Sequence, residues 1–323
     1  MPKILITRRL PASLDALDAI ASVEVWPERQ PPPYEVLLDR IRQVDGLLCL
    51  LTDPIDRGLI EAGVNLKVIS QMAVGYDNID VAAATARRIP VGHTPDVLTD
   101  ATADFAWALL MAAARRVVEA ERFTRARQWQ TWEPDLLLGA DVGGATLGIV
   151  GLGRIGQAVA RRAKGFEMRI LYTNQTRCSP ELEQQLGVEF VAFEELLARA
   201  DFVTIHTPLT PQTHHLFSDH QFEQMQSSAV LINTARGAVV DPAALYRALS
   251  QGRIAAAAID VTEPEPIPSD SPLLTLENLI ITPHIASASR QTRTKMATMA
   301  IENLIAGLQG NRLPHCVNPE VYS

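Results

Sequence analysis

The chain has 323 residues, which is too long for one ordinary hydrophobic core and therefore predicts two domains. Hydrophobic residues make up 47% and charged residues 20% of the sequence, as in an ordinary globular protein. The formal net charge of −8 argues against a nucleic-acid partner, because binding a phosphate backbone usually needs a basic face.

The N-terminus and the cysteines indicate where such a protein resides. Met1–Ile6 lacks the long apolar core of a secretion signal and leads into Arg8 and Arg9. No apolar run approaches the roughly 20 residues that span a bilayer, so we expect no membrane partner. The cysteines, at 49, 178 and 316, are odd in number and dispersed, which predicts neither a disulfide framework nor a thiolate metal site. We therefore expect a cytoplasmic protein with reduced cysteines.

Short β-branched runs alternate with helical segments in the first third of the chain, a pattern typical of a parallel sheet covered on both faces. The predicted strands are Lys3–Thr7, Val23–Trp26, Gly46–Leu51, Lys67–Ser70 and Pro90–Gly92. The predicted helices include Leu14–Ile20, Pro33–Arg42 and Val81–Arg87. These elements predict one small doubly wound domain.

A second alternating series follows a long apolar helix, predicted over Ala103–Arg125, and a loop that carries two tryptophans. Its six predicted strands are Thr146–Val150, Arg169–Tyr172, Phe202–Thr207, Ala229–Asn233, Ala255–Asp260 and Asn278–Thr282. Six strands are what a dinucleotide-binding sheet requires. The tail, Ser289–Gln309, is one long helix with no strand after it, so we expect it to pack back on the first domain. The second domain would then be an insertion in the first.

The strongest local signal is the glycine pattern Gly151, Gly153 and Gly156, which follows an apolar strand and opens a helix. Gly151 permits the tight turn, Gly153 lets the backbone approach a pyrophosphate, and Gly156 lets helix and strand pack closely. The helix N-terminus then offers amide donors to the phosphate charge. The segment predicts a bound dinucleotide.

The end of the next strand bears on which dinucleotide fits. An acidic residue there usually binds the ribose hydroxyls of NAD, but this chain has Thr173 and Asn174. The nearby Arg177 could pair with the 2′-phosphate of NADP. We therefore expect NADP as the preferred cofactor, with NAD as the alternative.

Three later strand ends carry useful groups: the guanidinium of Arg236, the carboxylates in the segment Asp260–Pro266, and the imidazole of His284. Loops at the carboxyl ends of parallel strands converge on the ligand crevice, so these groups should meet there. Arginine binds a substrate carboxylate with a fork of donors, and histidine can give a proton to a developing alkoxide. A carboxylate behind the histidine orients it and stabilises the imidazolium. The set predicts hydride transfer to a 2-keto acid.

These motifs resemble the D-isomer-specific 2-hydroxyacid dehydrogenase family essentially from end to end. The resemblance rests on Gly75–Asp80, Gly151–Gly156, Ala235–Gly237, Glu263–Pro266 and Thr282–Ile285. It implies a Rossmann cofactor domain (100–285, with a dimerisation helix and loop) inserted into a flavodoxin-like substrate domain (1–99 and 286–323). It also implies a homodimer.

The resemblance further implies roles for individual residues. Arg236 is the expected substrate anchor, Glu265 the partner of the histidine, and His284 the acid/base; Glu263 does not match the family position. The expected substrate-binding residues are Leu51, Val74, Gly75, Trp132, Arg236 and Ser287, with Val74 and Gly75 offering backbone amides. The expected cofactor-binding residues are Thr102, Gly151, Gly153, Arg154, Ile155, Gly156, Asn174, Gln175, Thr176, Arg177, Thr207, Pro208, Thr213, Thr234, Ala235, Arg236, Asp260, His284 and Ala286.

Within the family, the segments Thr94–Asp104 and Trp132–Pro134 are most similar to the glyoxylate and hydroxypyruvate reductases. One departure concerns the cofactor, since glyoxylate reductases that prefer NADP often have an arginine where this chain has Gln175. The alternatives are a dehydrogenase of larger keto acids, and a dinucleotide-sensing co-repressor that binds partners without turnover. The compact length disfavours the second of these.

The remaining polar residues are predicted to be structural. The histidines at 93, 206, 214, 215, 220 and 315 share no metal-ligand spacing with carboxylates, so no metal site is expected. His214 and His215 are adjacent, so their side chains should diverge on a regular element. Asp77 and Asp80 are interpreted as a turn and a helix cap after Gly75.

Overall fold

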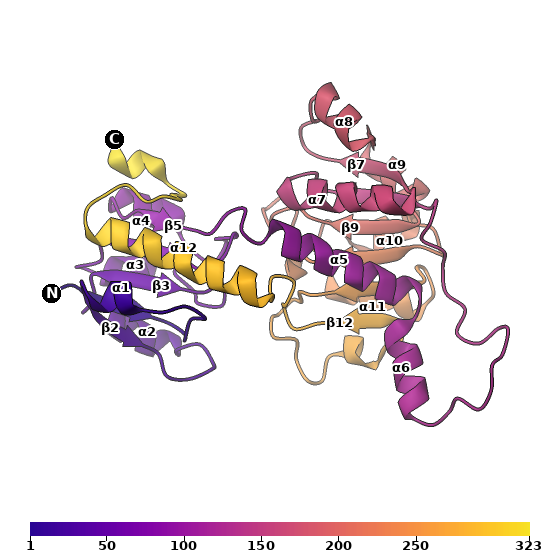
Figure 1. Cartoon of the computed structure of the whole chain (residues 1–323), viewed down its shortest axis with the longest axis horizontal. Coiled ribbons are helices and arrows are strands. Elements are labelled where there is room, and N and C mark those ends of the chain that lie inside the picture. The colour runs from indigo at the N-terminus through magenta and orange to yellow at the C-terminus, as the bar shows by residue number, and fades with distance from the viewer. The chain divides into compact units, whose positions relative to one another are not determined.

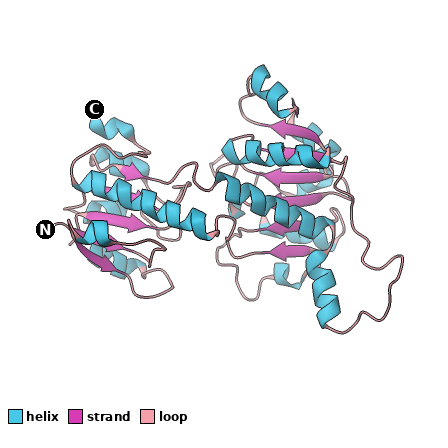
Figure 2. Cartoon of the chain, viewed as in Figure 1, coloured by secondary structure: helices cyan, strands magenta, loops and turns pink.

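The computed structural model describes all residues, 1–323, and the chain divides into two compact units (Figure 1). The first unit contains Met1–Leu98 and Ala288–Ser323, and the second contains Thr99–Ser287. Each unit is built on one parallel sheet with helices packed against it (Figure 2). No helix combines the length and the apolar character needed to cross a membrane.

The first unit has a five-stranded sheet in the order β2-β1-β3-β4-β5, which is the flavodoxin-like order. Alternate strand residues face opposite layers: Leu5 packs with α2, α3 and α4, whereas Ile4 and Ile6 pack with α1 and α12. The strands are β1 Lys3–Ile6, β2 Ser22–Val25, β3 Gly46–Cys49, β4 Val68–Gln71 and β5 Val91–Gly92. The helices are α1 Asp15–Asp18, α2 Tyr34–Ile41, α3 Arg57–Ala62, α4 Val81–Ala86 and α12 Arg290–Leu308. Helix α3 is not among the elements named from the sequence.

The last helix, α12, completes the first unit although it follows the second unit in sequence (yellow in Figure 1). Its N-terminus is capped by Ser289, which accepts a hydrogen bond from the Thr292 amide. Ser70 of β4 donates to the carbonyl of Ala300 at 2.7 Å. These contacts place the tail helix on the face of β3 and β4.

The second unit has a seven-stranded sheet in the order β12-β11-β10-β9-β6-β7-β8. Its strands are β6 Thr146–Val150, β7 Arg169–Thr173, β8 Val188–Phe190, β9 Phe202–Ile205, β10 Val230–Asn233, β11 Ala256–Ile259 and β12 Leu279–Ile281. Its helices are α5 Thr99–Ala114, α6 Val117–Arg125, α7 Arg154–Ala163, α8 Pro180–Leu186, α9 Phe193–Arg199, α10 Asp219–Gln224 and α11 Pro242–Ser250. Because β6 lies between β7 and β9, the order reverses there, as at the ligand crevice of a Rossmann sheet. The predicted fold class, two doubly wound parallel-sheet domains, is confirmed.

Two details differ from the elements predicted for this unit. The sequence predicts six strands, but a seventh, β8, pairs with β7 at the edge of the sheet. It contains only Val-Glu-Phe, which is too short for a hydrophobic pattern to show.

The single helix predicted over Ala103–Arg125 is also wrong, because the structure has two helices, α5 and α6. Arg116 between them has a left-handed φ of 51° and pairs with Glu119. The carbonyl of Ala114 accepts from the Ala140 amide at 2.8 Å rather than continuing the helix. The break between α5 and α6 therefore depends on the segment around Ala140, which lies far from Ala114 in the sequence.

Candidate active site

The glycine loop between β6 and α7 leaves a backbone surface open to a ligand. Gly151 has φ 99°, and a Cβ there would lie 2.7 Å from the carbonyl oxygen of His206. A Cβ on Gly156 would lie 2.2 Å from the carbonyl oxygen of Gly151, so neither position accepts a side chain. Nothing lies within 4 Å of a Cβ built on Gly153, at the start of α7. These features fit a pyrophosphate at the helix N-terminus.

The expected cofactor-binding residues lie at the carboxyl ends of six strands and on α5. They follow β6 (151–156), β7 (174–177), β9 (207–213), β10 (234–236), β11 (260) and β12 (284 and 286), and Thr102 is on α5. Thr234 has a buried hydroxyl with no hydrogen-bond partner. A buried orphan hydroxyl at the same edge of the sheet as the open glycine loop suits a bound dinucleotide, which would supply the missing partner.

The segment after β7 holds Asn174 against the glycine loop. Asn174 Oδ1 accepts from the Leu152 amide at 2.7 Å, which links the end of β7 to the phosphate loop. Gln175 and Thr176 are exposed.

Arg177 is paired within the protein. Its guanidinium donates from Nε and Nη2 to the two oxygens of Glu183, both at 2.8 Å. The hydrogen bonds from Arg177, and then that from Tyr172, lower the pKa of Glu183 to about 2. Glu183 was not predicted as part of the site, because its role depends on α8 folding back beside β7. A 2′-phosphate must therefore compete with this carboxylate for Arg177.

Asn233, at the end of β10, shapes the loop that carries Arg236. Its side chain donates to the Arg236 carbonyl at 2.9 Å and accepts from the Ala235 amide at 3.0 Å. Arg236 is half-buried. A Cβ on the following Gly237 would lie 2.0 Å from the Thr262 carbonyl oxygen, so the loops after β10 and β11 touch here.

Asp260, expected at the cofactor, is buried and holds the loop that carries His284. Its carboxylate accepts from Thr282 Oγ1 (2.6 Å), from the Ile285 amide (2.9 Å) and from the Ala286 amide (2.6 Å). His284 itself has a left-handed φ of 54°. Three donors on one buried carboxylate hold this unusual backbone in place.

His284 and Glu265 form the central pair of the site. His284 Nδ1 donates to Glu265 Oε1 at 2.6 Å, and their side chains are 23% and 30% exposed. Burial of Glu265 opposes its ionisation and is the largest single influence on its pKa. The His284 hydrogen bond and charge, the Thr262 amide and the charge of Arg236 nevertheless hold the pKa of this carboxyl below its ordinary value. The structure therefore brings Arg236, Glu265 and His284 together.

The expected substrate residues of the first unit lie at the ends of β3 and β4. Leu51 follows β3, and Val74 and Gly75 follow β4. Gln71 donates to the Gly75 carbonyl at 3.2 Å, and His93 Nδ1 lies 3.0 Å from the Val74 carbonyl. These contacts hold the backbone whose amides are expected to meet the substrate.

The structure also shows the surroundings of three other residues that the sequence analysis names. Asp80 caps α4 by accepting from the Ala83 amide at 2.8 Å, which confirms its structural role. His206 bonds to Thr204 at 2.8 Å, and burial lowers its pKa to about 3. Trp132 is 79% exposed in the loop after α6.

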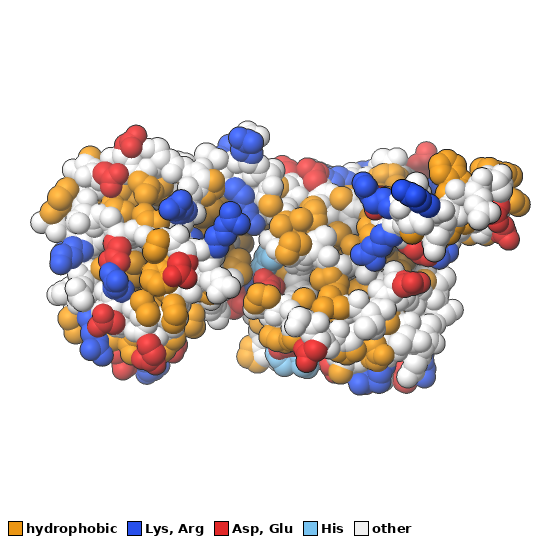
Figure 3. Space-filling model, turned by 90° about the horizontal axis from the view of Figure 1, so that it is seen from below, with side chains coloured by type: hydrophobic (Ala, Val, Ile, Leu, Met, Phe, Trp, Pro, Cys, Tyr) orange, Lys and Arg blue, Asp and Glu red, His pale blue; other side chains and the backbone are white.

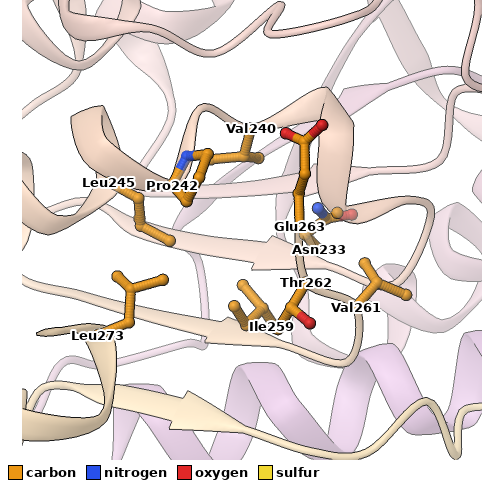
Figure 4. A pocket seen from close by; sticks show the side chains of 10 residues that line it. Asn233, Val240, Pro242, Leu245, Ile259, Val261, Thr262, Glu263 and Leu273 are labelled. Atoms are coloured by element: carbon orange, nitrogen blue, oxygen red, sulfur yellow. The ribbon is translucent and has the colours of Figure 1, made fainter. Parts of the chain in front are cut away.

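A cavity of about 10 Å³ lies beneath the loops after β10 and β11 (Figure 4). Among the residues that line it are Asn233, Val240, Leu245, Ile259, Glu263 and Leu273. This volume is about that of one water molecule, so the cavity holds neither a dinucleotide nor a keto acid.

Known proteins resemble the chain over its full length. Residues 107–286 match the model of the D-isomer specific 2-hydroxyacid dehydrogenase NAD binding domain. The chain is 52% identical to the glyoxylate reductase of Korarchaeum cryptofilum, covering 99% of this chain and 97% of the relative. The TT0316 protein from Thermus thermophilus is 48% identical with a TM-score of 0.92, covering 98% of this chain and 99% of that one. The NADPH-dependent glyoxylate/hydroxypyruvate reductase from Sinorhizobium meliloti, solved with NADP and malonate, is 31% identical with a TM-score of 0.86, covering 98% and 97%.

The Rossmann sheet, the open glycine loop and the matches define an oxidoreductase that uses a nicotinamide dinucleotide and a small keto or hydroxy acid. The chain belongs to the D-isomer-specific 2-hydroxyacid dehydrogenase family.

Proposed function

We propose that this chain reduces small 2-keto acids, such as glyoxylate and hydroxypyruvate, to 2-hydroxy acids, of the D configuration where the product is chiral, with His284 as the proton donor. The observation that carries the proposal is the 2.6 Å bond between His284 Nδ1 and Glu265, through which the carboxylate orients the imidazole ring and stabilises its protonated form. The names of relatives at about half identity support the choice of substrate.

The chain supplies binding and proton transfer in this reaction. Arg236 holds the substrate carboxylate with its planar fork and orients the keto group. His284 Nε2 gives its proton to the oxygen that becomes the alcohol, and Glu265 stabilises the imidazolium before that transfer. When bound, the nicotinamide supplies the hydride that reaches the keto carbon. Thr234 and the glycine loop Gly151–Gly156 would hold the dinucleotide.

The direct test is to mix the purified chain with glyoxylate and NADPH or NADH and to follow the loss of reduced-cofactor absorbance. We expect turnover with at least one cofactor and a D-configured product when the keto acid is hydroxypyruvate. Cofactor binding without turnover of any small keto acid would contradict the proposal and favour a dinucleotide-sensing role.

We also propose a preference for NADP over NAD. Asn174 offers no negative charge to repel a 2′-phosphate, and Arg177 is exposed, although it pairs with Glu183. A charge-assisted contact between Arg177 and the phosphate should favour NADPH by about tenfold to a hundredfold.

Specificity constants for both reduced cofactors test the NADP preference. Arg177→Ala should remove most of the preference, and Asn174→Asp should favour NADH by repulsion of the phosphate. Glu183→Gln weakens the competing ion pair and should increase the preference. A wild-type protein that favours NADH would refute this interpretation of the loop and leave the proposed catalytic residues standing.

A homodimer is the proposed assembly. Helix α6 buries none of its residues, and large hydrophobic side chains nearby are exposed: Val117 (52%), Trp129 (62%), Trp132 (79%) and Leu138 (65%). Figure 3 shows hydrophobic side chains on the projecting segment at the right. Sedimentation equilibrium should give twice the 35.3 kDa chain mass, and Trp129→Ser with Trp132→Ser should lower it. A wild-type mass of one chain would contradict the proposal.

A further inference from the structure

Two adjacent histidines lie in a turn whose backbone is tightly held, between β9 and α10. Thr213 Oγ1 donates to the Pro208 carbonyl at 2.7 Å, and the His214 amide donates to the Thr210 carbonyl at 2.9 Å. The His215 amide donates to the Ala238 carbonyl at 2.8 Å. Such a turn presents its side chains in fixed directions without help from a ligand.

The two imidazoles do not diverge, which corrects the expectation from the sequence. His215 has a left-handed φ of 49°, so the chain is not a regular element there. The rings of His214 and His215 stack instead, with centroids 4.0 Å apart and planes 27° apart. Both rings therefore point to the same place.

Glu263, from the loop after β11, meets both rings. His215 Nε2 donates to Glu263 Oε2 at 2.6 Å, and His214 Nε2 lies 3.5 Å from Glu263 Oε1. One potential ligand atom from each of the three residues lies within 4.8 Å of the others. In Figure 4 the side chain of Glu263 extends away from the strands that line the cavity, and the carboxylate lies at its far end. The spacing along the chain gives no sign of this cluster, because loops distant in sequence converge here.

The ligand set has a definite chemical preference. Two imidazole nitrogens and one carboxylate oxygen suit Zn²⁺ and neighbouring divalent transition metals, whereas Mg²⁺ and Ca²⁺ prefer oxygen alone. Bonds of about 2.0–2.1 Å put tetrahedral ligands about 3.3 Å apart, so the 2.6 Å contact must open by less than an ångström. The side chains of His214, His215 and Glu263 are 51%, 37% and 33% exposed, so an ion and completing water molecules can reach them.

We propose that His214, His215 and Glu263 form a binding site for one Zn²⁺-type divalent metal ion per chain. The site shares no residue with the His284–Glu265 pair. It rests on side chains that have no assigned part in keto-acid reduction, so it stands whether or not the proposed function holds.

Isothermal titration of tag-free protein with Zn²⁺ tests the site. We expect one Zn²⁺ per chain, no competition from excess Mg²⁺, and Co²⁺ absorption bands typical of nitrogen and oxygen ligands. Bound Zn²⁺ should also raise the thermal unfolding midpoint, because the assembled site binds it more tightly than the unfolded chain does.

Four variants make the assignment specific. Glu263→Gln, His214→Gln and His215→Asn should each weaken Zn²⁺ binding by about 100-fold or more, since even partners behind metal ligands contribute about 10- to 100-fold. Asparagine tolerates the left-handed backbone at 215, and circular dichroism checks that every variant is folded. His220 is exposed on α10 and lies outside the cluster, so the His220→Ala variant should bind Zn²⁺ as tightly as the wild type does.

The proposal is overturned if the wild type takes up no Zn²⁺, or if folded Glu263→Gln and His215→Asn proteins bind it as tightly as the wild type. Loss of binding in His220→Ala alone would also overturn it, because the ion would then be bound elsewhere.

Discussion

Replacing Glu265 with glutamine keeps the length of the side chain and an oxygen that accepts from His284 Nδ1, but removes the negative charge. The lowered pKa of Glu265 means that it is ionised wherever the enzyme works near neutral pH. Its charge then stabilises protonated His284, the form that gives a proton to the substrate. Glutamine should therefore stabilise the proton-donating form less, so that the rate of reduction, followed as pH rises, begins to fall at a lower pH.

The size of this shift follows from the hydrogen bond. A bond to a charged group contributes about 1.5–3 kcal/mol, and a neutral one about 0.5–1.5 kcal/mol. The pair is short and mostly buried, so a difference of about 1.4 kcal/mol is reasonable, which corresponds to about one pH unit. At pH values above both midpoints, kcat/KM should be about tenfold lower than in the wild type, and at acidic pH the two should converge.

The assay is kcat/KM for glyoxylate reduction, measured with saturating reduced cofactor across the pH range in which the wild-type rate falls. Glu277→Gln, an exposed carboxylate just before β12, is the matched control and should leave the midpoint in place. A Glu265→Gln profile with the wild-type midpoint, whatever its height, would refute the idea that this carboxylate stabilises the imidazolium.

Three further substitutions test the rest of the site. His284→Ala should lower turnover about 100-fold or more with cofactor affinity nearly unchanged, measured by initial rates and fluorescence titration; near wild-type turnover removes the histidine from its role. Arg236→Lys keeps the charge but loses the planar fork, so KM should rise and kcat should fall together, and unchanged kinetics would mean that the carboxylate is held elsewhere. Gly237→Ala places a Cβ 2.0 Å from the Thr262 carbonyl oxygen, so the loop that carries Glu265 must shift. We expect a lower melting temperature and a loss of turnover, and a fully active, equally stable variant would contradict the close contact of these loops.

Features that depend on neighbours in the chain could be predicted from the sequence. The glycines at 151, 153 and 156 mark their own turn, because backbone freedom and close approach are local requirements. Apolar runs mark strands that are buried on both faces of a parallel sheet. Since such strands end at one edge, the sequence alone predicts that Arg236, a carboxylate of Asp260–Pro266 and His284 lie together.

Features that depend on distant segments were decided only by the tertiary structure. Asp260 turns inward because three donors from the loop after β12 need an acceptor. His214 and His215 stack because of one left-handed residue, and Glu263 reaches them from a loop 48 residues away from His215. The spacing of residues in the sequence does not predict this contact between His214, His215 and Glu263. It says nothing about which loops the sheet brings to the same edge.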